Sequence, residues 1–174
     1  RFLVGQAVSS MDLQGVSFVA SGVDTRPVMD VRCDGICRLT QSAFDGPQVG
    51  LSWSGPGTSV MDDVAVNAVQ QAVEASGSGH ADWANLTVAA SERVLTVQTP
   101  SSSIANVAVH LNSDDGRGID VLGGEHMWSN ITAEKAFVSS DRTSIGLNAW
   151  YSRITVDQMI CLLYTSPSPR DIGE

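Results

Sequence analysis

A short pattern of alternating apolar and polar positions returns along the chain at a nearly constant spacing. In each copy an apolar residue is followed by a small or hydroxyl residue and usually by a second apolar residue, as in Leu86-Thr87-Val88. Alternation with a period of two predicts a β-strand with one buried face. The first apolar residues of successive copies lie 21 to 25 residues apart, and they are Val16, Leu39, Val64, Leu86, Val107, Ile131 and Ile154.

Self-similarity at such a period predicts a solenoid, in which each turn buries its apolar face against its neighbours. Further short strands are expected at 49–53, 94–98, 119–122 and 145–148, which gives two or three strands per turn. Stacked turns of this kind describe a parallel β-helix with about 4.8 Å between rungs. We expect the apolar anchors to form one inward column. An outward column is expected from Ser17, Thr40, Ala65, Thr87, Ala108, Thr132 and Thr155.

One segment, 62–76, fits two interpretations. Val66, Val69 and Val73 have helical spacing, acidic residues precede them and Gly77 follows them. The same residues also fill the place of the third rung. The segment is therefore expected to be either a rung or a short helix outside the coil. Leucine-rich repeats and β-sandwiches fit less well, because the leucine-rich consensus is missing and a sandwich has no long-range repeat.

Composition and charge narrow the possible partners. The chain has 174 residues, of which 17% are charged, and 16 glycines, which suits a β-protein with many turns. The net charge of −9 argues against nucleic acid, because no basic stripe is present to neutralise phosphates. No apolar run is long enough for a membrane span.

The two parts of the chain differ in character. Residues 161–174 resemble the translation of a sequencing adapter, and Pro167 and Pro169 interrupt any strand there. We therefore expect 1–160 to be the solenoid, as a fragment of a longer protein, and 161–174 to be a non-native tail.

Asn85, Asn106 and Asn130 occupy one position in three successive copies of the repeat. One interpretation is a ladder of side-chain amides that hydrogen-bond from turn to turn at a bend. The other is N-glycosylation, because Asn85-Leu-Thr and Asn130-Ile-Thr are sequons. Asn106-Val-Ala is not a sequon yet shares the position, which favours the ladder.

Cys33 and Cys37 flank the sequence Asp34-Gly35-Ile36, which is typical of a turn. A zinc site is poorly supported, because the chain has three histidines and no second cysteine pair. The two cysteines are expected to form a local disulfide, as in a secreted protein, or to be reduced core residues. His80, His110 and His126 are isolated from any serine or cysteine motif in the sequence, which gives a nucleophilic triad little support.

The recurring Asn-Ile-Thr and Asn-Leu-Thr phrases resemble the right-handed parallel β-helix, or pectin-lyase-like, superfamily over about residues 11–160. The resemblance implies an all-β, right-handed parallel β-helix solenoid of about six to seven coils. It also implies an extracellular or cell-surface protein that recognises or cleaves a polysaccharide or surface glycan. The alternative is a non-catalytic surface repeat or adhesin, since this fold alone does not decide function.

The stretch 112–121 is similar to the polygalacturonase motif Asn-Thr-Asp-Gly-Ile-Asp, with extra residues. The resemblance implies that Asp114 or Asp115 activates water and that Asp141, about one coil later, protonates the leaving oxygen. Carboxylates on neighbouring coils suit inverting hydrolysis, which needs roughly 6.5–9.5 Å between them. Arg142 departs from the motif, and Asp-Gly pairs also occur in ordinary turns.

Substrate-binding candidates are Arg142, Trp150 and Tyr151. The two aromatic side chains would form a platform for a sugar ring or would cover the coil. No cofactor is expected, although Asp114, Asp115 and Asp120 carry the oxygen ligands that Ca²⁺ prefers.

Overall fold

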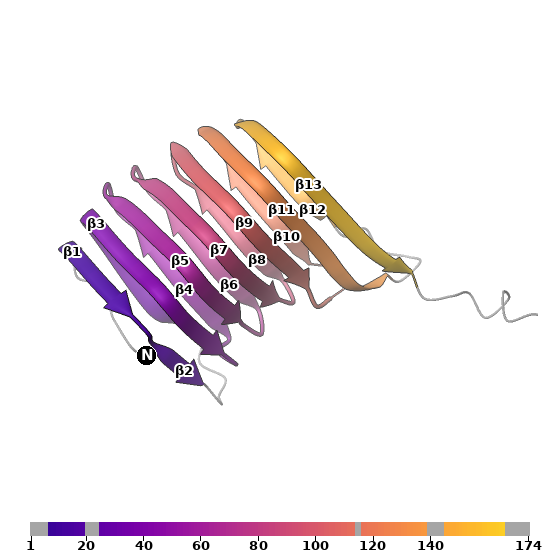
Figure 1. The fold of residues 1–174 in the computed structure, drawn as a ribbon, viewed down its shortest axis with the longest axis horizontal. Helices are drawn as coiled ribbons and strands as arrows, with labels where there is room; N and C mark the ends of the chain where they lie inside the picture. Colours follow the sequence, from indigo (N-terminus) through magenta and orange to yellow (C-terminus); the bar gives the residue numbers. More distant parts are fainter. Residues whose placement is uncertain (1–6, 20–24, 114–115, 139–144, 166–174) are drawn as a thin grey trace, which may run out of the picture.

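A computed structural model of the chain describes residues 7–19, 25–113, 116–138 and 145–165. It is a parallel β-solenoid of about six turns, as predicted (Figure 1). The described part of the chain is all-β and contains no helix that could span a membrane. Its strands are β1 Ala7–Gln14, β2 Ser17–Val19, β3 Pro27–Asp45, β4 Val49–Ser54, β5 Thr58–Asn67, β6 Gln71–Ser76, β7 His80–Ala90, β8 Arg93–Gln98, β9 Ser101–Leu111, β10 Arg117–Leu122, β11 Glu125–Val138, β12 Ile145–Trp150 and β13 Arg153–Thr165.

Each rung consists of one long strand followed by one short strand. The long strands β5, β7, β9, β11 and β13 form one parallel ladder, and the short strands β4, β6, β8, β10 and β12 form the other. Strand β3 joins the ladders, since its first part pairs with β4 and its second part with β5. Figure 1 shows the long strands lying side by side along the coil, with the short strands behind them.

Every long strand bends at one residue in the left-handed region. These residues share a register position and have φ between 50° and 62°, and they are Gln41, Asp63, Asn85, Asn106, Asn130 and Gln158. Asparagine tolerates this conformation better than most residues, because its short polar side chain bonds locally. The Nδ2 group of Asn106 donates to Oδ1 of Asn85 at 3.0 Å, and that of Asn130 donates to Oδ1 of Asn106 at 2.9 Å. The predicted asparagine ladder is therefore confirmed.

Branched and aromatic side chains fill the interior in stacked columns. Before the bend the column contains Leu39, Met61, Trp83, Ile104 and Trp128, each at most 3% exposed. Beyond the bend, Val64, Leu86, Val107 and Ile131 stack as predicted. On the short strands the column contains Met29, Leu51, Val73, Leu95 and Ile119.

Two of the expected anchors lie in other columns. Leu39 pairs with Met61, and Ile154 pairs with His126, whereas Met159 continues the column of Ile131. In the outward column Thr40 and Thr155 are likewise displaced. For Ile154 and Thr155 the reason is unequal rung length: Leu111 and Arg117 are six residues apart, whereas their respective register partners Lys135 and Ile145 are ten apart. In the first turns, Ser42 and not Leu39 stands in register with Val64.

Segment 62–76 is a rung, and the helical alternative is wrong. Val66 and Val73 are buried, but they lie on separate strands, β5 and β6. Val69 is 44% exposed in the turn between them. Val66 near the end of β5 and Val73 near the start of β6 face inward, and the three-residue turn 68–70 between these strands contains Val69. The resulting spacing of three and four residues imitates that of a helix.

Cys33 and Cys37 form a disulfide with Cα atoms 6.0 Å apart, and both side chains are buried. They bracket the corner in the middle of β3. A Cβ atom at Gly35 would lie about 2.1 Å from the carbonyl oxygen of Ser9, so the close approach of β1 requires glycine there.

Strand β13 continues past the expected end of the solenoid. Cys161 pairs in register with Ala133, and Thr165 pairs with Val138. The first five residues of the expected tail therefore lie in the ladder, and 166–174 fall outside the described residues.

Candidate functional site

The outer face of the long strands, ahead of their bends, carries an open groove of about 340 Å³. Its lining includes His80 of β7, Ser101 and Ser103 of β9, Glu125 of β11 and Arg153 of β13. Four successive rungs thus contribute to it. The groove crosses the strands and follows the direction in which the rungs stack.

Two columns of outward side chains form this surface. His80, Ser101, Glu125 and Arg153 share one register position. Because adjacent parallel strands lie about 4.8 Å apart, neighbours in a column are close enough to pair. The second column, two residues further along each strand, contains Asp82, Ser103, Met127 and Thr155.

The first column contains two polar pairs. Nδ1 of His80 lies 2.7 Å from Oγ of Ser101. Nη1 of Arg153 lies 3.4 Å from Oε1 of Glu125, and both of those side chains are well exposed. An exposed ion pair contributes little stability, which leaves its charged groups available to a ligand.

Buried polar groups hold the floor of the groove. Nε1 of Trp128 donates to Oγ of Ser102 at 2.8 Å, and that hydroxyl lies 2.8 Å from Nδ1 of His126. Nε2 of His126 lies 2.6 Å from the carbonyl oxygen of Gly123, which can only accept. The ring therefore donates from Nε2 and accepts the Ser102 hydroxyl at Nδ1. Every side-chain polar atom of this Trp128–Ser102–His126 network has a hydrogen-bond partner.

Trp150 and Tyr151 stand at the corner that immediately precedes Arg153. Trp150 is 56% exposed and Tyr151 is 97% exposed, so neither covers the coil. Trp150 pairs in register with Leu122, which is also exposed. The two aromatic residues predicted to bind substrate thus lie on the rung that supplies Arg153 and Thr155 to the groove, three and two residues before Arg153 in the chain.

Tyr151 occupies a position that three other rungs give to a glycine at positive φ, while one rung places Thr99 there. Its register equivalents include Gly55, Gly77 and Gly123, which have φ of 99°, 104° and 68°. Tyr151 itself has φ of 53°. A bulky residue in this region is strained, by about 1–3 kcal/mol.

The expected catalytic carboxylates cannot be placed. Asp114, Asp115 and Asp141, together with Arg142, lie outside the described residues. Asp120 is described, and its carboxylate accepts from Nδ2 of Asn148 at 2.7 Å and lies 3.5 Å from Nη1 of Arg117. Across the described ranges, no three His, Cys, Asp or Glu side chains come together as metal ligands.

His80 and Ser101 were missed in the sequence because they are 21 residues apart. That separation is one rung, so comparing positions one period apart would have found the pair. The same comparison gives Ser102 and His126, which are 24 residues apart.

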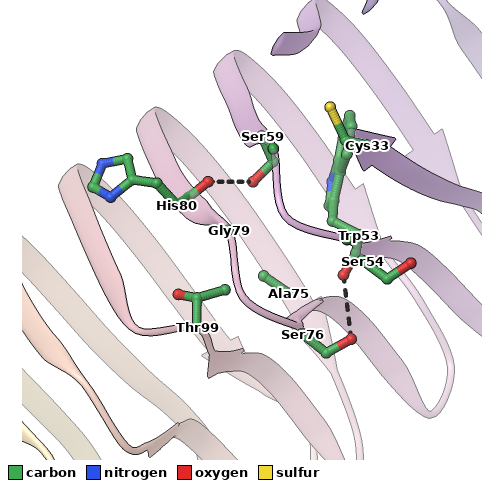
Figure 2. A pocket seen from close by; sticks show the side chains of 11 residues that line it. Cys33, Trp53, Ser54, Ser59, Ala75, Ser76, Gly79, His80 and Thr99 are labelled. Carbon is green, nitrogen blue, oxygen red and sulfur yellow. Dashed lines mark hydrogen bonds between the residues drawn. The ribbon is translucent and has the colours of Figure 1, made fainter. Parts of the chain in front are cut away.

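A second hollow lies at the corner shown in Figure 2, lined by Cys33, Trp53, Ser59 and Gly79 among others. Its volume of about 10 Å³ is about that of a single water, which excludes a larger ligand. Figure 2 also shows the His80 ring projecting away from this corner, while the His80 carbonyl accepts from Ser59 at 3.4 Å. The 340 Å³ groove is therefore the better candidate for a binding site.

Comparison with known proteins found no matching family model, no similar curated protein and no similar solved structure.

Proposed function

We propose that this solenoid binds a linear polysaccharide along the groove on its long strands. The observation that carries the proposal is Tyr151, an almost fully exposed aromatic side chain in a strained backbone conformation, two residues before Arg153 of the groove lining. Backbone strain concentrates at functional sites, where the surrounding fold maintains it. An aromatic ring exposed in this way offers a flat apolar face to a sugar ring.

The groove supports the same proposal through its shape and its polar groups. Its lining comes from four stacked rungs, and hydrogen bonds of the buried residues Ser102 and His126 hold its floor in place. The hydroxyls of Ser101 and Ser103 and the ring of His80 supply donors and acceptors that match sugar hydroxyls. Since these groups come from successive rungs, a polymer can make similar contacts repeatedly.

The disulfide supports an extracellular or cell-surface location for this activity. Disulfides form and persist in oxidising compartments and are rare in the cytosol. Cys33 and Cys37 are joined inside the first turns of the coil.

Binding is tested by affinity electrophoresis and calorimetry against a panel of soluble polysaccharides. Tyr151→Ala and Trp150→Ala are expected to weaken binding by about tenfold or more each, which corresponds to about 1.4 kcal/mol. Val69→Ala is the matched control, because Val69 is an exposed apolar residue in a turn of another rung. Absence of binding to every polymer, or equal binding by Tyr151→Ala and the parent chain, would contradict the proposal.

Cleavage is the sharper form of the proposal. It predicts that the chain releases reducing ends from its polysaccharide and that Asp141→Asn lowers that rate by about 100-fold or more. Glu92→Gln is the control, since Glu92 is an exposed carboxylate in the turn between β7 and β8, away from the groove. If the parent chain releases no reducing ends from any polymer of the panel, the cleavage form of the proposal is wrong and only polysaccharide binding is left.

A surface repeat of the adhesin type is the second candidate. Beyond the bend, the outward register positions carry small side chains, Ala43, Ala65, Thr87, Ala108 and Thr132. This gives a flat face on which a protein partner would lie. Thr87→Arg and Thr132→Arg would then abolish cell-surface adhesion while polysaccharide binding by the groove stayed unchanged.

A further inference from the structure

We infer that the polymer bound in the groove is uncharged, and this inference depends on the proposed function. The polygalacturonase resemblance implies a polyanion instead. The charges around the groove decide between the two.

Carboxylates dominate the outer face of the long strands from β5 to β13 ahead of their bends. Along this described face, Glu125 lies in the first outward column and Asp82 in the second, while Asp62 and Asp157 lie in the third. Against these four carboxylates the same strands present one guanidinium, that of Arg153. That guanidinium already lies 3.4 Å from the Glu125 carboxylate.

The next cation on this face, Arg38 of β3, lies one rung from Asp62 but outside the groove lining. Arg38 of β3 pairs in register with Val60, which in turn pairs with Asp82. Arg38 is therefore two rungs from Asp82 and beyond the groove lining. The chain as a whole carries a net charge of −9, so its long-range field has the same sign as the excess of carboxylates on this face of the long strands.

A polyuronate would bring a carboxylate with every sugar residue into this field. Binding of a polyanion requires cationic side chains that replace its counterions, and like charges facing each other are unfavourable. A neutral glycan needs only hydroxyl partners and an apolar surface. Ser101, Ser103, Thr155 and His80 offer the hydrogen-bonding groups, and Tyr151 offers the surface.

The test compares neutral and acidic polymers on the same protein. Mixed-linkage β-glucan and galactomannan serve as neutral probes, and polygalacturonate serves as the acidic probe, in calorimetric titrations at about 0.05 M and 0.5 M NaCl. A neutral polymer is expected to bind at least about tenfold more tightly than polygalacturonate, with an affinity that salt leaves unchanged.

A double variant tests the electrostatic cause. Asp82→Asn with Asp157→Asn removes two of the four carboxylates and should strengthen polygalacturonate binding at low salt by more than it changes the binding of either neutral polymer. Thr87→Asn is the control, because it alters an exposed strand position without changing charge.

The outcomes separate the two claims. Tighter binding of polygalacturonate than of either neutral polymer would overturn the inference and leave the proposed function standing. Binding of none of the three polymers would overturn the inference, and failure of the whole panel would overturn the proposed function as well.

Discussion

Nδ1 of His80 and Oγ of Ser101 lie 2.7 Å apart although 21 residues separate them in the chain. Their contact exists because parallel rungs stack in register, which turns a separation of one period into direct neighbourhood. The groove is built from such contacts between rungs. Its chemistry therefore depends on register as much as on residue type.

Ser102→Ala is expected to destabilise the fold by about 2–4 kcal/mol. The substitution leaves Nε1 of Trp128 and Nδ1 of His126 buried without their common partner, and each unsatisfied group costs about 1–3 kcal/mol. Chemical denaturation measures the free energy of unfolding. Ser101→Ala, one residue earlier on the outward face, loses only the single contact with His80 and should lower it by about 0.5–1 kcal/mol. Similar free energies of unfolding for the two variants would contradict a stabilising role of the buried Trp128–Ser102–His126 hydrogen bonds.

Asn106→Ala is expected to cost about 2–3 kcal/mol. The residue uses both ends of its amide in the ladder, and alanine pays a further penalty of about 1–2 kcal/mol at positive φ. Asn106→Gly keeps the conformation and loses only the amide bonds, so it should cost about half as much. The prediction fails if glycine is the more destabilising replacement in the same denaturation experiment.

Tyr151→Gly is expected to stabilise the chain by about 1 kcal/mol while abolishing the aromatic contribution to binding. Glycine relieves the strain at φ 53°, as it does at the equivalent corners of other rungs. Thermal unfolding and calorimetric binding are measured on one preparation. Thr87→Gly is the control on a regular strand, where glycine should lower stability. A less stable Tyr151→Gly variant would show that the tyrosine packs after all.

Reduction of the Cys33–Cys37 disulfide, or its replacement by two alanines, is expected to lower stability by about 2 kcal/mol. This is the loop-entropy contribution of a bridge that closes about five residues. Unfolding curves with and without reductant measure it. Cys161→Ser should have no effect, because Cys161 is free and exposed. Loss of stability in Cys161→Ser under the same conditions would point to another thiol pairing.

The period and the alternation together predicted the fold and the middle of its core. Leu86, Val107 and Ile131 stack because the turns between them differ in length by only a few residues. Ile154 was misplaced because four additional residues between Lys135 and Ile145 are invisible to a pattern match. His126 also faces inward on the neighbouring rung, so the alternation fitted either register.

The site was predicted only in part. Trp150 and Tyr151 were identified as candidates by residue type. That neither ring packs into the core follows only from the exposed fraction of each side chain in the structure. Asparagines at one position of three successive repeats indicated a bend there. Gln41 and Gln158 adopt the same left-handed conformation, which their residue type does not indicate. The acidic outer face depends on which carboxylates share a register, and that is a property of the stacked strands.

The chain is four residues longer between Lys135 and Ile145 than between Leu111 and Arg117, yet Ile145 pairs with Arg117 and Arg153 pairs with Glu125. The ladders therefore keep their phase although successive rungs differ in length. Additional residues between two strands of a rung should then be tolerated, which makes the turns of the coil natural attachment points for fluorophores, epitope tags or foreign loops on a rigid display scaffold.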